Sequence, residues 1–230
     1  MMQLIENAQD CSAVDACPWL AAYPLRSAPR EADGPAKRAL DVVVAALTLV
    51  LALPAIALAA VAIKLTSPHG PVLFVQRRTG YRGRQFKLYK LRTMVPNAEA
   101  MKSRLAHLND RQWPDFKIKR DPRVTRVGRI LRTTSIDELP QLFNVLRGDM
   151  SLVGPRPTSL PSSEYERWQA ERFGVRPGLT GLWQVAARDS SSFDQRLRLD
   201  IAYATRQSLR LDLEILARTV PTVLFGRGAA

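Results

Sequence analysis

One uncharged stretch constrains the fold of this chain more than any other feature. Residues 42–63 form a run of 22 positions without a charged side chain. A helix over this run would be about 33 Å long at roughly 1.5 Å per residue, which matches the apolar core of a bilayer. Some 40 residues precede the run, so it lacks the short basic start of a secretory signal. We therefore expect a membrane anchor that is retained.

Two features of this anchor argue against a simple crossing of the membrane. Pro54 lies near its middle, where the missing backbone donor and the proline ring favour a bend. Basic residues flank both ends, Lys37 and Arg38 before and Lys64 after, so charge gives no orientation. We expect a re-entrant helix, with a kinked single span and a buried core helix as alternatives. Asp41, at the start of the anchor, is expected at the interface near Arg38.

The positive charge of the chain is concentrated in two windows. The 230 residues carry 34 Lys and Arg against 21 acids, a net charge of +13. Residues 76–93 and 117–132 hold fourteen of these bases and one acid, so the rest of the chain is neutral. A solvated surface or a lipid-headgroup patch is the simplest explanation. With no zinc-finger, homeodomain or RNP-like pattern and an anchor just upstream, a phosphorylated small molecule is a better partner than nucleic acid.

An acidic pair, Asp137 and Glu138, directly follows the second basic window. The apolar spacing over residues 139–146, with Gly148 as a stop, predicts an amphipathic helix over about 138–147. A carboxylate pair at its start can be catalytic, or it can cap the helix, because Ser135 and Glu138 match a capping box. Pro140 fits a helix start near Asp137 better than one at Ser135. Spacing alone leaves both explanations open.

The remaining sequence divides into three parts. Residues 1–36 show no sustained period and are expected to be a loosely ordered extension, residues 37–66 the anchor, and residues 67–230 a single catalytic region. Residues 72–75 and 85–91 are predicted to be strands, and residues 96–108 a helix. Two cysteines, Cys11 and Cys17, fit a reducing compartment and exclude a zinc site built on thiolates.

Several long stretches, taken in order, carry a family resemblance over residues 37–229. They read KRALD, GPVLFVQRRTGYRGRQFKLYKLRTM, DPRVTRVGRILRTTSIDELPQLFNVLRGDMSLVGPRP, RPGLTGLWQV and SLRLDLEILARTV. On these residues the chain resembles the bacterial sugar transferases, the monotopic polyprenyl-phosphate phosphoglycosyltransferases, in their short, minimal form. His69 departs from the family's usual SPGP loop, and residues 1–36 have no counterpart.

The resemblance implies a fold and a reaction. The fold would be an α/β, mostly helical, membrane-associated domain with a small β component and a re-entrant helix bent at Pro54. Asp137 would be the nucleophile of a catalytic dyad with Glu138. It would take a sugar phosphate from a nucleoside-diphosphate sugar, usually a UDP-sugar, and pass it to polyprenyl phosphate. The resemblance also implies Mg²⁺, with Asp137 as a ligand.

The same matching implies binding residues and a location. Lys90, Arg132 and Arg156 would bind phosphate, and Trp183 and Gln184 could border the nucleotide or the sugar. The protein would act at the cytoplasmic face of the bacterial inner membrane, among membrane lipids. A membrane-tethered, non-catalytic binder of anionic lipid or polyanion is the alternative function.

Overall fold

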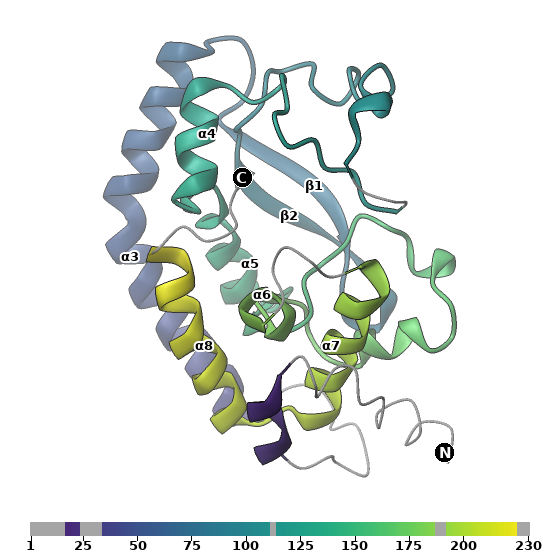
Figure 1. The fold of residues 1–230 in the computed structure, drawn as a ribbon. Coiled ribbons are helices and arrows are strands. Elements are labelled where there is room, and N and C mark those ends of the chain that lie inside the picture. The colour runs from purple at the N-terminus through teal and green to yellow at the C-terminus, as the bar shows by residue number, and fades with distance from the viewer. Residues whose placement is uncertain (1–16, 24–33, 111–113, 187–191, 225–230) are drawn as a thin grey trace.

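The computed structural model describes residues 17–23, 34–110, 114–186 and 192–224, which are mostly helical with two small sheets (Figure 1). The mostly helical α/β class expected from the sequence is thereby confirmed. The α-helices are α3 (Pro35–Thr66), α4 (Arg126–Thr133), α5 (Gln141–Arg147), α6 (Leu182–Ala186), α7 (Phe193–Arg206) and α8 (Leu209–Leu224). The strands are β1 (Leu73–Thr79), β2 (Gln85–Leu91), β3 (Ser151–Val153) and β4 (Gly178–Thr180).

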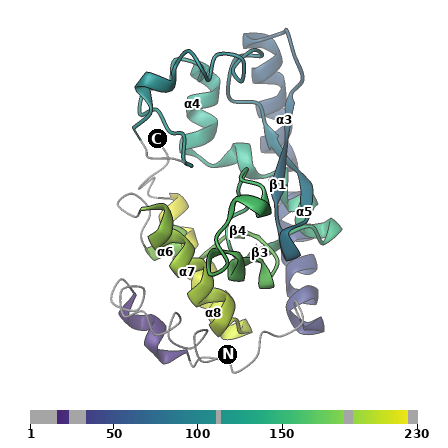
Figure 2. The same cartoon turned by 90° about the vertical axis from the view of Figure 1, so that its right-hand side faces the viewer.

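The predicted anchor is one continuous helix, α3, along one edge of the molecule (Figures 1 and 2). Pro35 occupies its first turn, where a missing donor costs nothing, and the helix continues through Pro54. α3 is long and apolar enough to cross a membrane, and only 11% of its most apolar window is buried. The buried core helix is therefore the wrong alternative. The re-entrant path stays a prediction.

The N-terminal part of α3 is joined to the rest of the molecule by polar contacts. Lys37 Nζ lies 2.8 Å from Asp212 Oδ2 on α8, and both side chains are buried. Asp41 accepts a hydrogen bond from the Leu152 amide at 3.0 Å. Arg38, the expected neighbour of Asp41 at the membrane interface, donates to the Val145 and Leu146 carbonyls at the end of α5. The interfacial position of Asp41 stays a prediction.

Strands β1 and β2 form an antiparallel hairpin, as the two predicted strand segments indicated. The register runs from Leu73 opposite Leu91 to Thr79 opposite Gln85. The helix predicted over residues 96–108 is wrong: this segment is a series of turns with one 3-10 turn, Ala106–Leu108. Ten of its thirteen side chains are exposed, and only Ala98, Met101 and Leu105 are half-buried, so little packing is available to stabilise a helix there.

A parallel pair, β3 and β4, leads into the loop of residues 154–157. The two strands approach so closely that only glycine fits at the crossing. A Cβ on Gly154 would lie 2.3 Å from the Arg176 carbonyl, and one on Gly178 would lie 2.0 Å from the Gly154 nitrogen. This contact sets where the loop with Arg156 begins.

Part of the predicted N-terminal extension belongs to the core. In the segment around Pro18–Ala22 (η1), Cys17 and Leu20 are fully buried. The Arg218 guanidinium of α8 lies 4.3 Å from the centre of the Trp19 ring, a cation–π contact. The expectation of loose order is wrong for residues 17–23, and most of the remaining extension lies outside the described residues.

Candidate active site

The acidic pair lies on a 3-10 turn, Ile136–Glu138, that precedes α5. The helix begins at Gln141, three residues later than predicted, with Pro140 as its N-cap. Ser135 adopts the left-handed conformation with φ 57° and makes no capping bond through its side chain. The capping-box explanation is therefore wrong. Its sequence pattern is present, but the Glu138 side chain bonds elsewhere.

Glu138 is held by two cations from distant parts of the chain. Its Oε1 accepts from Lys90 Nζ at 2.8 Å and from Arg156 Nη2 at 2.5 Å, and its Oε2 accepts from Arg156 Nη1 at 3.2 Å. Burial by itself would raise the pKa of Glu138, but the charges and hydrogen bonds of Arg156 and Lys90 outweigh it and hold this pKa well below its usual range. Glu138 is thus a permanent, oriented carboxylate.

Asp137 has the opposite environment. It is 7% exposed, and among the described residues its carboxylate has neither a hydrogen-bond nor an ion-pair partner. Burial, followed by the negative charge of Glu138, raises the pKa of Asp137 to about 6, although Lys90, Arg132 and Arg156 act against the rise. Two adjacent carboxylates with pKa values moved in opposite directions are typical of sites in which they have different tasks.

Of the three predicted phosphate-binding cations, two reach the acidic pair directly. Lys90, on β2, and Arg156, on the loop after β3, both contact Glu138. Arg132, on α4, donates from Nε to Thr93 Oγ1 at 3.0 Å and acts on Asp137 through its charge. Burial lowers the pKa of Arg132 and of Lys90.

The structure adds a residue that the sequence did not single out. Arg78, on β1, donates to the Pro157 carbonyl at 3.4 Å. Burial, together with the charge of Arg156, lowers its pKa to about 10. The sequence showed Arg78 only as one base in a window of seven, with no local signal to separate it from its neighbours.

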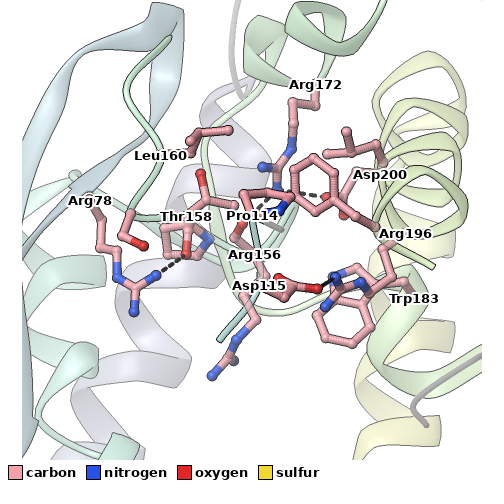
Figure 3. Close-up of a pocket in the computed structure, with 14 residues that line it drawn as sticks. Arg78, Pro114, Asp115, Arg156, Thr158, Leu160, Arg172, Trp183, Arg196 and Asp200 are labelled. Atoms are coloured by element: carbon pink, nitrogen blue, oxygen red, sulfur yellow. Dashed lines mark hydrogen bonds and ion pairs between the residues drawn. The ribbon is translucent and has the colours of Figure 1, made fainter. Parts of the chain in front are cut away.

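A cavity of about 170 Å³ has Arg156 among its lining residues (Figure 3). It adjoins the acidic pair, because the Arg156 side chain also bonds Glu138. Trp183 lines the cavity, and the Arg196 guanidinium lies 5.4 Å from the centre of its ring. The contact of Trp183 with substrate stays a prediction. Asp115, which also lines the cavity, pairs with Arg196 (Figure 3). Gln184 is buried and is not among the lining residues.

The model of one family, described as bacterial sugar transferase, matches residues 32–226. The chain belongs to this family. It is 48% identical over 207 residues to the UDP-glucose:undecaprenyl-phosphate glucose-1-phosphate transferase of Caulobacter vibrioides, covering 85% of this chain and 72% of that protein. It is 39% identical over 205 residues to the exopolysaccharide production protein ExoY of Rhizobium meliloti. The aligned residues cover 87% of this chain and 90% of that protein.

A longer relative is the undecaprenyl-phosphate galactose phosphotransferase of Salmonella typhimurium. The two are 43% identical over 200 residues, which cover 84% of this chain and 41% of the relative. The chain therefore spans about two fifths of the length of that protein.

The described residues fit Mg²⁺ shared with a substrate. No group of three His, Cys, Asp or Glu side chains that could hold a metal occurs in the described part of the chain. Asp137 offers one unpartnered hard oxygen donor. Mg²⁺ is commonly bound by one or two carboxylates together with substrate phosphates. Asp137 therefore suits this mode of binding, and an all-protein cage does not fit.

Proposed function

We propose that this protein transfers a sugar 1-phosphate from a nucleoside-diphosphate sugar, of the UDP type, to polyprenyl phosphate such as undecaprenyl phosphate. The observation that carries the proposal is the contrast within the acidic pair: Asp137 is buried and unpartnered among the described residues, beside a Glu138 fixed by Lys90 and Arg156. A nucleophile needs an oxygen that is not engaged in other bonds, and Asp137 offers one. Glu138, by contrast, is held in one orientation by its two cations.

The first half-reaction uses Asp137. A carboxylate oxygen of Asp137 attacks the sugar-bearing phosphorus of the donor and forms an oxygen–phosphorus bond. The bond from this phosphorus to the bridging oxygen breaks, and the nucleoside monophosphate leaves with that oxygen and its electron pair. Arg156 and Lys90 supply the positive charge that stabilises the transferring phosphoryl group.

The second half-reaction regenerates the carboxylate. A phosphate oxygen of the polyprenyl phosphate attacks the same phosphorus, and the bond to Asp137 breaks. The product is a polyprenyl-diphosphate sugar. Division into two steps lets one site serve a soluble donor and a lipid acceptor in turn.

Mg²⁺ is the proposed cofactor, with Asp137 as its protein ligand. When bound, it would neutralise charge on the donor phosphates. The second proposed contact is with the donor: the cavity beside Arg156, with the aromatic ring of Trp183 in its wall, would hold the nucleotide or the sugar. Gln184 would support the Trp183 turn from behind, since it does not line this cavity.

The proposed setting is the bacterial inner membrane, with residues 67–230 forming the catalytic region on the cytoplasmic face. Residues 37–66 would be a re-entrant helix that bends at Pro54 and returns to the side it entered. The exposed apolar residues of α3, such as Leu51 and Leu65, support contact with lipid. The name of the Rhizobium relative supports a role in exopolysaccharide production.

The decisive experiment measures release of UMP by the purified, membrane-reconstituted protein with Mg²⁺, polyprenyl phosphate and a panel of UDP-sugars. We expect turnover with at least one donor, and none with Asp137→Asn of unchanged fold. Without polyprenyl phosphate, mass spectrometry of the wild-type protein should detect a phosphosugar on the peptide that contains Asp137. No turnover with any donor, with binding to anionic vesicles retained, would favour the non-catalytic binder.

A further inference from the structure

A buried ion pair lies behind the loop that carries Arg156. Arg172 belongs to the 3-10 segment Gln169–Gly174 (η6), and Asp200 belongs to α7. Arg172 Nη2 lies 2.6 Å from Asp200 Oδ2, and each side chain is 3% exposed. Burying two charges is costly unless they are paired and bonded further, so a buried pair in this place calls for an explanation.

The guanidinium of Arg172 bonds the loop directly at Arg156 (Figure 3), and it is linked to Thr158 through the Tyr165 hydroxyl. Its Nη2 donates to the backbone carbonyl of Arg156 at 2.5 Å. Its Nη1 donates to the Tyr165 hydroxyl at 3.3 Å, which in turn lies 2.5 Å from Thr158 Oγ1. One planar, rigid group thus contacts Arg156, which binds Glu138, and reaches Thr158 through Tyr165.

We propose that Arg172, held in place by Asp200, is a positioning residue that aims the Arg156 guanidinium at Glu138 and at the phosphate of the donor. The inference rests on the proposed function, in which Arg156 binds that phosphate. The ion pair itself does not touch the reacting atoms. Its effect passes through the backbone of Arg156.

The loop is built to transmit such a constraint. Prolines on both sides of Arg156 restrict its backbone, so a displaced carbonyl shifts the whole residue. Two further carbonyls of the loop also have donors: Pro157 accepts from Arg78, and Thr158 accepts from the Thr79 amide at 2.9 Å. Among the described contacts, however, the carbonyl of Arg156 itself is held by Arg172.

A small displacement here has a large expected effect. Arg156 forms a two-pronged contact with Glu138, whose geometry both nitrogens must satisfy. A misplacement of about 1 Å far from the reacting atoms can cost an enzyme roughly 100-fold in rate. Loss of Arg172 should therefore act as a partial loss of Arg156.

The test is a double-mutant cycle on kcat/KM for UMP release, with Arg172→Gln, Arg156→Lys and the double variant. In the wild-type background we expect Arg172→Gln to lower kcat/KM by about 10- to 100-fold. In the Arg156→Lys background the same change should cost less than about threefold, because the group being positioned is already altered. Asp200→Asn should follow the same pattern.

A matched control separates positioning from general damage. Arg206→Gln removes a different buried arginine, on α7, that bonds the Ala202 carbonyl of its own helix, and it should leave kcat/KM within about threefold. Equal losses from Arg172→Gln in both backgrounds would overturn the positioning role while leaving the proposed function intact. A wild-type protein that turns over no donor would instead overturn the proposed function, and this inference with it.

Discussion

Glu138 accepts hydrogen bonds from both terminal nitrogens of Arg156, at 2.5 and 3.2 Å, across 18 residues of sequence. Lysine keeps the charge of Arg156 but not the planar fork, so Arg156→Lys can make only one of these contacts. We expect kcat/KM to fall by about 10- to 100-fold, on the scale of losing one well-placed donor. Arg84→Lys, the same change at an exposed arginine of the first basic window, is the control and should retain activity.

The pH dependence of turnover should report Asp137. Without a bound metal its pKa is raised to about 6, and only the ionised form can act as nucleophile or bind Mg²⁺, so kcat/KM at limiting Mg²⁺ should fall as the pH drops through about 6. Arg156 lowers this pKa, and Arg156→Lys should therefore move the acid limb to higher pH if the lysine lies further away. The range from pH 5 to 7 extends roughly one unit either side of this pKa. A kcat/KM that does not change over this range would contradict the assignment to Asp137.

Burial also raises the pKa of Asp200 to about 6. Titration of Asp200 would therefore produce a fall in kcat/KM over the same pH range as titration of Asp137. The two are separable by mutation. Asp200→Asn should lower activity at every pH and keep the acid limb. A limb that disappears in Asp200→Asn would assign the titration to Asp200.

Asp137→Asn should stabilise the protein while it abolishes turnover. An acid whose folded-state pKa is raised binds its proton more tightly when folded, so its cost to stability begins above pH 4 or so and is complete above about 6. Removing the charge should raise the free energy of unfolding by up to about 3 kcal/mol at pH 8 and by almost nothing at pH 3. Thermal melts at both pH values, with the exposed Glu164→Gln as control, measure the difference.

Gly128 tests how α4 is placed. A Cβ on Gly128 would lie 1.9 Å from the Thr93 carbonyl oxygen, next to the Thr93 hydroxyl that bonds Arg132. Gly128→Ala should therefore lower the free energy of unfolding by about 1–3 kcal/mol, the usual cost of overpacking, and reduce activity. Gly174→Ala is the matched control, because a Cβ there meets nothing within 4 Å.

The path of α3 can be decided by labelling. With Cys11 and Cys17 replaced by alanine, single cysteines at Arg30 and His69 flank the helix. A re-entrant helix predicts that a membrane-impermeant thiol reagent modifies both from the same side. Modification from opposite sides would show a crossing and reject the re-entrant path. Pro54→Leu, which restores the missing backbone donor, should shift the second label toward the opposite side.

Local patterns were enough for several elements. An uncharged run of 22 positions predicts a long apolar helix whatever surrounds it, and α3 is that helix. The apolar or alternating patterns of residues 72–75 and 85–91 predicted two strands, and the structure contains both, with β1 ending four residues later than predicted. The basic windows likewise indicated a cationic site, and Lys90 comes from the first of them.

Other features depend on which distant groups meet. The spacing of Ser135 and Glu138 fits a capping box. The Glu138 carboxylate nevertheless binds Lys90 and Arg156, because two cations stabilise it more than one backbone amide would. The turns at residues 96–108 likewise reflect an absence of packing that no local pattern reveals.

Read alone, the sequence determined the apolar helix, the concentration of positive charge and the presence of an acidic pair, since each is a property of neighbouring residues. Only the tertiary structure decided which carboxylate is free and which is bound. Asp137 and Glu138 are adjacent in the chain, but 48 and 18 residues separate Glu138 from Lys90 and Arg156. Burial and charge act through space, so the pKa values of the pair are set by folding.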